Sequence, residues 1–206
     1  MLTEQTLTRF LDAVAAKTPT PGGGSVAAAA AALGAALGVM VGRYSKGDAA
    51  REAADAIWKL AGEARDLVNE DAEAYGLVAS AMQRPKDTPE ARAGRDAALQ
   101  NALIRAAEVP LRGVRLAHRG LDLLGELTKS YNKNLETDLL IAADLLYAGG
   151  CGFRWNVLVN LAAIRDPAAA AKLKEGLSLW TEARRMHETF QAQGGLWLES
   201  KGLQGI

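Results

Sequence analysis

The sequence predicts an all-α fold, a single domain built as a bundle of long, partly kinked helices. Apolar residues recur at helical spacing along most of the chain, which is the main sequence signal for amphipathic helices. No stretch alternates apolar and polar residues over a length useful for a strand. Short breaks containing Gly or Pro separate the segments, and 206 residues fit one domain. We expect a helical domain over residues 1–193 and a C-terminal tail over 194–206.

The first two helices are expected to flank a turn rich in proline and glycine. Thr3 is the predicted N-cap of a first helix that ends near Lys17. The second helix should begin only after Pro21, because proline fixes its own φ and pushes the preceding residue out of helical conformation. It should run to about Arg43 or Tyr44.

The second helix carries almost no side-chain bulk. Its sixteen residues 26–41 include eight alanines and no charge. The run is shorter than the roughly 20 residues that span a bilayer, so we expect protein, and not lipid, to cover it. Such a surface is useful in water only where another helix packs closely against it. Either a helix of the same chain or a symmetric partner can supply that cover.

Two long helices are expected next. The first covers residues 49–82 and follows an N-cap at Asp48. The pair Asp87-Thr88 supplies the cap of the second, with Pro89 in its first turn. We expect this helix to continue through Pro110 with a kink, because no glycine or polar cluster precedes that proline.

The last third of the chain is expected to form shorter helices. Asn134 is the predicted N-cap of a helix over residues 135–147. The glycine-rich run 149–152 should interrupt the pattern before a second, largely apolar helix. Asp166-Pro167 caps the last helix, which we expect to end at residues 193–195.

Composition argues against several classes of protein. A formal net charge of zero and a pI of about 6.8 argue against a nucleic-acid partner. The single Cys151 rules out an intramolecular disulfide, and with only two histidines it offers no zinc-ligand pattern, so we expect no bound metal. The N-terminus lacks the basic and apolar regions of a signal peptide. We therefore expect a protein of the reducing cytoplasm with no membrane partner.

The turn Pro21-Gly22-Gly23-Gly24-Ser25 is the first candidate site. Three glycines leave the backbone bare, so another group can approach it closely. The helix that follows exposes unpaired N–H groups at its start, which is a natural place for an anion. The alternative is a tight turn that only leads into a buried core helix.

Two aspartates fall on apolar rows of predicted helices. Asp71 lies four residues after Leu67 and four before Tyr75, and a carboxylate on such a stripe must be hydrogen-bonded, paired or functional. Asp138 falls in the second turn of its helix, in line with Ala142. There it either complements the helix dipole or takes part in chemistry. Both residues are candidates for a structural or a chemical role.

Two asparagines share one face of an apolar helix. Asn156 and Asn160 are four residues apart, so their amides point the same way. Buried amides need partners for both the N–H and the carbonyl group. The pair therefore indicates either a structural polar network or the recognition of a flat, amide-bearing ligand.

Six segments carry a recognisable pattern in a fixed order and spacing. They are Thr18 to Ala28, Asp71 to Tyr75, Arg84 to Thr88, Ala107 to Leu111, Asn132 to Asp138, and Asn156 to Asn160. Over roughly residues 4–190, the chain resembles the formiminotransferase-cyclodeaminase C-terminal domain family, which includes stand-alone methenyltetrahydrofolate cyclohydrolases. The glycine run alone is moderately specific, whereas the further blocks in register make the resemblance strong.

The chain departs from this family pattern in two places. The family often has a lysine-rich stretch after the alanine helix, where this chain has only Ser45-Lys46-Gly47-Asp48. The family usually has glycine where Tyr131 stands. Both departures bear on the identity of the substrate more than on the fold.

The resemblance implies a homodimer that acts on one-carbon tetrahydrofolates. Cyclohydrolase activity opens 5,10-methenyltetrahydrofolate with water to give 10-formyltetrahydrofolate, and cyclodeaminase activity closes 5-formiminotetrahydrofolate and expels ammonia. Each needs proton transfer and hydrogen-bond donors, and no cofactor beyond the tetrahydrofolate substrate. We favour the cyclohydrolase because the chain has no transferase domain to deliver a formimino substrate. A non-catalytic, folate-binding or scaffolding dimer is the alternative of another class.

The resemblance also implies roles for particular residues. Asp138 is the first candidate for acid–base catalysis and Asp71 the second. Backbone N–H groups of the turn Gly22 to Ser25 would meet the folate, and Lys46 would attract its glutamate tail. The residues expected to orient the amides of the pterin are Asn132, Asn134, Asn156 and Asn160.

Overall fold

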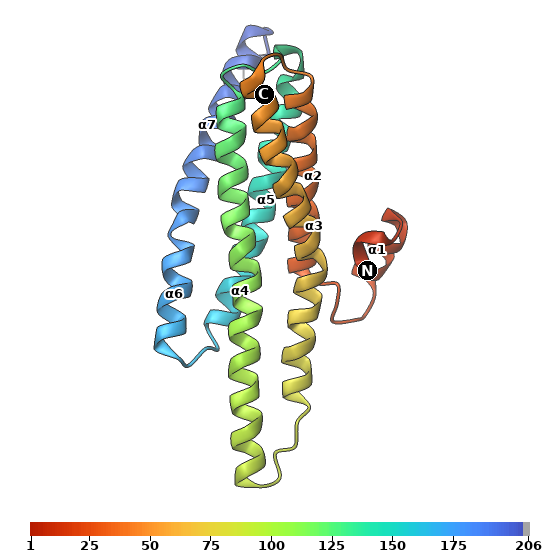
Figure 1. Ribbon diagram of the computed structural model, residues 1–206, viewed down its shortest axis with the longest axis vertical. Helices are drawn as coiled ribbons and strands as arrows, with labels where there is room; N and C mark the ends of the chain where they lie inside the picture. The colour runs from red at the N-terminus through yellow and green to blue at the C-terminus, as the bar shows by residue number, and fades with distance from the viewer. Residues whose placement is uncertain (204–206) are drawn as a thin grey trace.

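The protein, seen in a computed structural model, is described over residues 1–203, and every regular element in that range is helical (Figure 1). Short loops connect the elements. In chain order they are η1 (Leu2–Glu4), α1 (Leu7–Ala15), α2 (Gly23–Arg43), α3 (Asp48–Met82), α4 (Pro89–Leu127), η2 (Lys133–Leu135), α5 (Glu136–Leu161), α6 (Pro167–Leu177) and α7 (Leu179–Ser200). The all-α, single-domain prediction is confirmed.

Helices α2, α3, α4 and α5 form an antiparallel four-helix bundle. Helix α2 packs against α3 on one side and α5 on the other, and α4 closes the ring between α3 and α5. Helices α6 and α7 lie against α4 and α5, while α3 and α4 extend as a hairpin beyond the other helices (Figure 1). The core is one continuous apolar cluster contributed by all four bundle helices.

Helices α2 and α5 approach each other closely because both present small residues at their contact. A Cβ on Gly34 would lie 2.9 Å from the Cβ of Leu145, and one on Gly149 would lie 2.8 Å from the carbonyl oxygen of Ala27. Neither position has room for a larger side chain. The prediction of a break at residues 149–152 was therefore wrong: α5 passes through this run unbroken, because its glycines serve packing and not a turn.

Several predicted helix ends also differ from the structure. The N-cap of α1 is Thr6 and not Thr3, since Thr3 lies in the 3-10 turn η1 and the Thr6 hydroxyl accepts from the N–H of Arg9. Asn134 lies within η2. The last helix is divided at Ser178 into α6 and α7, and α7 continues past the expected end to Ser200. The predicted division of the chain at residue 193/194 stays a prediction.

Pro110, where a kink in α4 was predicted, is compensated by a residue of α5. Helix α4 runs through the buried Pro110 without ending, as predicted. Proline lacks an N–H, so it leaves the carbonyl four residues earlier without its helical partner. That carbonyl belongs to Ala106, and the side-chain Nδ2 of Asn160 donates to it at 3.0 Å. Asn160 therefore compensates for the proline inside the bundle.

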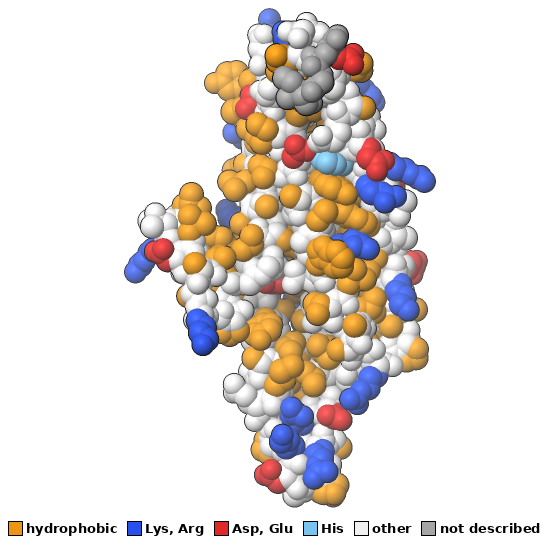
Figure 2. Space-filling model, turned by 180° about the vertical axis from the view of Figure 1, so that it is seen from behind, with side chains coloured by type: hydrophobic (Ala, Val, Ile, Leu, Met, Phe, Trp, Pro, Cys, Tyr) orange, Lys and Arg blue, Asp and Glu red, His pale blue; other side chains and the backbone are white. Residues whose placement is uncertain are grey.

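One side of the molecule carries an apolar surface that its own chain does not cover. We call it the outer face and define it by Val26 and Leu33 of α2 with Ile141, Trp155 and Val159 of α5, all of which are exposed. Seen from behind, hydrophobic side chains gather across the middle of the visible surface, and most charges lie at its edges and ends (Figure 2).

Helix α1 is a second uncovered element. It stands beside the bundle (Figure 1) and buries none of its residues, and Leu7 and Leu11 are largely exposed. The alanine helix α2 is, by length and composition, apolar enough to cross a membrane, but 56% of its most apolar window is buried inside the protein. The chain itself therefore covers only the side of α2 that faces the bundle, and the opposite side stays exposed.

Candidate functional site

The first turn of α2 packs against α3 near Asp71. Beyond this level α3 continues in the hairpin that it forms with α4. Helix α2 begins at Gly23, so the N–H groups of its first turn have no acceptor within the helix. The carboxylate of Asp71 lies directly against this turn, and a Cβ added to Gly24 would overlap it. The buried Ser25 hydroxyl contacts Oδ2 of Asp71 at 3.3 Å and the carbonyl oxygen of Val68 at 2.8 Å. The missing side chain at Gly24 is what lets the carboxylate reach the helix start.

The surroundings of Asp71 change its acidity. Burial raises the pKa of the Asp71 carboxyl above its ordinary value of 3.8, and hydrogen bonds from the hydroxyl and the backbone N–H of Ser25 oppose that rise. A carboxyl with a raised pKa both accepts and returns a proton more readily near neutral pH. This raised pKa, at a carboxyl held against the start of a helix, makes Asp71 the better candidate for acid–base chemistry.

Asn156 borders the same turn from α5. A Cβ on Gly23 would lie 3.8 Å from its Nδ2, and this Nδ2 donates to the carbonyl oxygen of Gly152 at 2.8 Å. The donor half of the amide is thus used within α5, and its carbonyl oxygen remains to accept from a ligand. Asn160 stands one turn further and serves the carbonyl of Ala106, so its position favours the structural interpretation over the ligand-binding one.

An ion-pair cluster that the sequence analysis did not single out lies one residue before Asp71. Oε2 of Glu70 accepts from Nη1 of Arg112 at 2.5 Å and lies 3.6 Å from Nη2 of Arg105. Glu70 points away from the apolar stripe of α3, which is why the sequence pattern gave it no role. The two arginines lie seven residues apart on α4, a spacing that places them on one face of the helix. This spacing is the sequence signal that could have revealed the cluster.

The other predicted site residues lie at the opposite end of α2. The side chain of Asn132 accepts from the N–H of Asn134, and its own backbone N–H donates to Oγ of Ser45 at 2.9 Å. Lys46 is exposed in the adjoining α2–α3 turn, beside a cavity of about 500 Å³. Asp138 is half-buried in the first turns of α5. Asn132 therefore shapes the loop, while Asp138 and Lys46 reach solvent.

Within one chain the two groups of residues cannot contact one ligand together. Asp138 and Asn156 lie on the same helix, and 156 − 138 = 18 residues at about 1.5 Å each separate them by roughly 27 Å. We call the group Gly22–Ser25, Asp71 and Asn156 the Asp71 end, and the group Lys46, Asn132, Asn134 and Asp138 the Asp138 end. The structure brings together the members of each group but not the two groups.

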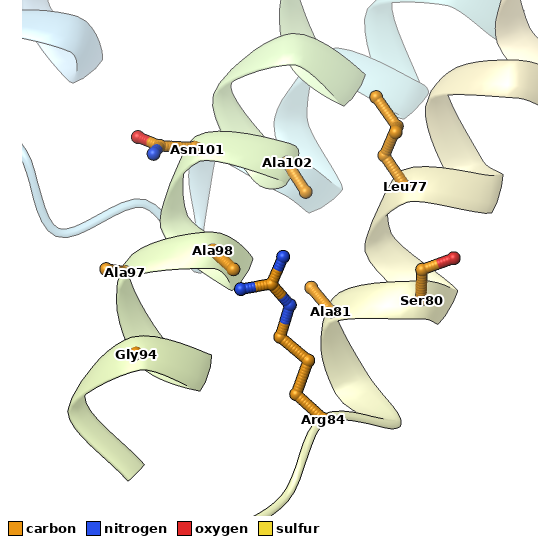
Figure 3. A pocket seen from close by; sticks show the side chains of 9 residues that line it. All are labelled: Leu77, Ser80, Ala81, Arg84, Gly94, Ala97, Ala98, Asn101 and Ala102. Carbon is orange, nitrogen blue, oxygen red and sulfur yellow. The ribbon is translucent and has the colours of Figure 1, made fainter. Parts of the chain in front are cut away.

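Two further groups of polar residues lie away from the Asp71 end. A cavity of about 510 Å³ opens between the far ends of α3 and α4, where the guanidinium of Arg84 lies over small residues (Figure 3). No carboxylate lines that cavity, so it offers no group for proton transfer. Near the Asp138 end, Tyr131 donates to the buried Glu136, and Gln193 of α7 donates to both. Within residues 1–203, no group of three or more His, Cys, Asp and Glu side chains is placed to hold a metal ion.

Comparisons with known proteins identify the family to which the chain belongs. Residues 6–178 match the family model described as formiminotransferase-cyclodeaminase. The methenyltetrahydrofolate cyclohydrolase of Methylorubrum extorquens is 35% identical over 197 residues, covering 91% of this chain and 95% of that protein. The formimidoyltransferase-cyclodeaminase of Rattus norvegicus is 36% identical over 185 residues, covering 86% of this chain but 34% of that protein.

A solved structure shows the same fold. The formiminotetrahydrofolate cyclodeaminase of Thermotoga maritima superposes with a TM-score of 0.80 at 29% identity, covering 97% of this chain and 98% of that one. The chain spans about a third of the length of the rat relative and nearly all of the bacterial cyclohydrolase. By its sequence and its fold, the chain belongs to the formiminotransferase-cyclodeaminase family.

Proposed function

We propose that the protein is a one-carbon tetrahydrofolate enzyme that hydrolyses 5,10-methenyltetrahydrofolate to 10-formyltetrahydrofolate. The observation that supports this most is the Asp71 carboxyl, held against the bare first turn of α2 with a raised pKa. Such a group supplies the proton transfer that the reaction needs. Two relatives match along nearly their whole length, and the one named cyclohydrolase is the more similar in sequence, at 35% identity against 29% for the cyclodeaminase, which favours the cyclohydrolase reaction.

In the proposed reaction Asp71 acts first as a base and then as an acid. Its carboxylate takes a proton from water as the water oxygen bonds to the carbon that bridges N5 and N10 of the substrate. A tetrahedral carbon with one hydroxyl group results. The carboxyl then returns its proton to N5 as the bond between that nitrogen and the carbon breaks, and the hydroxyl proton leaves as a formyl carbonyl forms. Starting from the cationic methenyl group, one proton is released overall.

The remaining residues of the Asp71 end position the substrate. Unpaired N–H groups at the start of α2 can donate to oxygens of the folate, since no side chain on Gly23 or Gly24 blocks them. The carbonyl oxygen of Asn156 can accept from an N–H of the pterin. No metal or cofactor other than the folate is assigned a step in this proposal.

The cyclodeaminase reaction uses the same apparatus and is the second candidate. There, starting from the protonated formimino group, Asp71 would take the proton from N10 as that nitrogen attacks the formimino carbon, and would return it to the resulting amino group as the bond to carbon breaks and ammonia leaves. The solved relative from Thermotoga maritima carries the cyclodeaminase name, so the experiments below also measure this reaction.

We also propose that the protein acts as a cytoplasmic homodimer. Support comes from the exposed outer face on α2 and α5 and from the uncovered leucines of α1, which in water favour burial against another surface. A second copy of the chain is the simplest source of that surface.

Three measurements on the wild-type protein test the function. The first follows the loss of methenyltetrahydrofolate absorbance, with the uncatalysed rate subtracted. The second measures ammonia released from 5-formiminotetrahydrofolate. The third is the thermal shift with methenyl- and formyltetrahydrofolate side by side, since a bound ligand raises Tm by mass action. We expect fast hydrolysis, little ammonia and a positive shift. A shift without turnover favours the binding protein, and no shift and no turnover contradict the proposal.

A further inference from the structure

A cavity of about 400 Å³ opens between α5 and α7, and no step of the proposed reaction uses it. Its walls carry two arginines, Arg154 from α5 and Arg184 from α7, and, among residues 1–203, no carboxylate. Three aromatic side chains, Tyr147, Trp155 and Trp180, line it as well. Sites for small ligands usually measure roughly 300–1,000 Å³ and combine apolar walls with a few polar groups. The cavity has the size and the composition of such a site.

The glycine run of α5 shapes this cavity. Gly149 and Gly152 face α2, where a Cβ on either residue would collide with Ala27. Gly150 faces α7 instead, and a Cβ there would lie 2.7 Å from the ring of Trp180. The bare backbone at Gly150 therefore lets this indole lie directly against α5. The same run thus packs α2 on one side of α5 and seats Trp180 beside the cavity on another.

The aromatic wall is held in place by its own neighbours. The ring of Tyr147 stacks on that of Trp180, with 5.0 Å between the ring centres, and on that of His187, with 4.0 Å. Nε2 of His187 lies 2.7 Å from Oδ1 of Asp144, within hydrogen-bond distance. Because α5 and α7 both fix these rings, a ligand that packs on them immobilises few further side chains. The entropy cost of binding is correspondingly small.

Both arginines have N–H groups available for an anion. Arg154 lies over the ring of Trp155, with its guanidinium carbon 5.2 Å from the ring centre. Such stacking uses the flat face of the guanidinium and leaves the N–H groups at its edge available. Nε of Arg184 lies 3.7 Å from Oε1 of Glu188, which is longer than a hydrogen bond. The cavity therefore combines apolar walls with donors that bind a carboxylate or a phosphate well.

We propose that this cavity binds a small aromatic anion, a flat ring that carries a phosphate or a carboxylate group. The ring packs among the aromatic side chains, and the anionic group meets Arg154 and Arg184. Two sources have this chemistry, a nucleoside monophosphate and an aromatic carboxylate such as p-aminobenzoylglutamate. Among the described lining residues only Trp155 also belongs to the outer face, so the α7 side of the cavity lies outside that face. The site does not depend on the proposed function, because Asn156 of the Asp71 end faces α2.

Calorimetric titration of the purified protein tests the proposal. Four probes are compared: adenosine monophosphate and p-aminobenzoylglutamate as aromatic anions, and adenosine and inorganic phosphate as controls that lack the charge or the ring. We expect an aromatic anion to bind once per chain, at least about 10-fold more tightly than adenosine or phosphate, since each lacks one set of contacts. The tighter aromatic anion identifies the source. Equal affinity for phosphate alone overturns the proposal, and so does the absence of saturable heat with both aromatic anions.

Substitutions locate the binding. Arg154→Gln and Arg184→Gln should each weaken binding about 10- to 100-fold, as expected for the loss of charge-assisted hydrogen bonds. Arg185→Gln, an exposed change next to the cavity lining, should bind like the wild type. All three variants should keep the wild-type kcat and KM for methenyltetrahydrofolate, because the Asp71 end is untouched. Unchanged affinity in the first two variants overturns the site, and a raised KM in them assigns the arginines to the folate substrate instead.

Cys151 reports occupancy of the same cavity. Its half-buried thiol lines the cavity and belongs to the single cysteine of the chain. Burial raises the pKa of this thiol, so its alkylation by iodoacetamide is followed by mass spectrometry at mildly alkaline pH, where more thiolate is present. A saturating aromatic anion should slow the alkylation several-fold in the wild type and not in a variant with both Arg154→Gln and Arg184→Gln. An unchanged rate in the saturated wild type contradicts this location.

Discussion

Similar polar residues, aspartate and asparagine, lie at the two ends of α2, but their surroundings differ. At the Asp71 end a carboxyl is packed against a helix start, bonded to Ser25, and its pKa is raised by burial. At the Asp138 end the half-buried Asp138 lies in the first turns of α5, and the side chain of Asn132 shapes a loop. The comparison teaches that a bare backbone position, here Gly24, lets a carboxyl pack against a helix start, where burial raises its pKa.

The largest expected effect comes from filling the space that Asp71 occupies. A Cβ at Gly24 overlaps the Asp71 carboxylate, so Gly24→Ala should displace that group by about the width of an atom. A misplacement of about 1 Å can cost roughly 100-fold in rate, and we expect a loss of that size in kcat for methenyltetrahydrofolate.

The matched control for this substitution is its neighbour in the turn. A Cβ at Gly22 meets only the carbonyl oxygen of Pro19, at an ordinary contact distance of 3.5 Å. Gly22→Ala should therefore keep its activity within a few-fold of the wild type. Equal losses in both variants would show that the turn as a whole, and not the placement of Asp71, limits the rate.

The next effect concerns stability and comes from Asn160, one helical turn beyond the Asp71 end. Asn160→Ala leaves the carbonyl of Ala106, freed by Pro110, without its donor. An unsatisfied buried carbonyl costs about 1–3 kcal/mol, and each kcal/mol lowers Tm by about 2–4 °C in a chain of this size. Thermal unfolding should show that fall. Asn134→Ala, at an exposed position, should change Tm far less, and a similar fall there would argue against the role of the proline.

A third prediction concerns stability and pH. Because the pKa of Asp71 is raised by burial in the folded protein, the folded state binds more protons than the unfolded state above pH 3.8, and stability falls as pH rises through the raised pKa. Asp71→Asn removes this penalty. Unfolding melts should find the variant more stable than the wild type at neutral pH, with the advantage fading below the ordinary pKa. A variant less stable at pH 7 would contradict the burial account.

The smallest expected effect is a displacement of the pH profile. The Ser25 hydroxyl lowers the pKa of Asp71 against the effect of burial. Ser25→Ala should therefore raise that pKa, and the acid limb of kcat/KM should move to higher pH, since the ionised carboxylate is the base. The profile should be measured across the acidic and neutral range. An unmoved limb would mean that another group sets the acid dependence.

Much of the fold could be predicted from local chemistry, and the largest failure concerns the glycines of α5. The cap at Thr88, the start of α2 after Pro21 and the continuation of α4 through Pro110 follow from backbone rules that need no tertiary information. The packing role of the glycines in α5 could not be predicted in this way, because glycine in a turn and glycine at a close helix contact have the same sequence signature. Only the position of α2 against Gly149 shows which applies.

The same error limited the prediction of the site. With a break at residues 149–152, Asp138 and Asn156 could fold back toward one another. In the continuous helix α5 they are held about 27 Å apart, so within one chain Asp138 cannot share a ligand with the start of α2, and the choice of Asp138 over Asp71 stays a prediction. The partners of Asn160 and of Glu70 lie on α4, far away in the sequence, and no local pattern could reveal them.

The central claim is that Asp71 carries the proton in folate chemistry at the start of α2. Its most direct test is the rate of methenyltetrahydrofolate hydrolysis by Asp71→Asn beside Glu73→Gln, an exposed carboxylate two residues further on the same helix. With folding confirmed by circular dichroism, Asp71→Asn should lose about 100-fold or more in kcat, within the range that general acid–base catalysis supplies, and Glu73→Gln should match the wild type. A near-normal rate for Asp71→Asn would contradict the account.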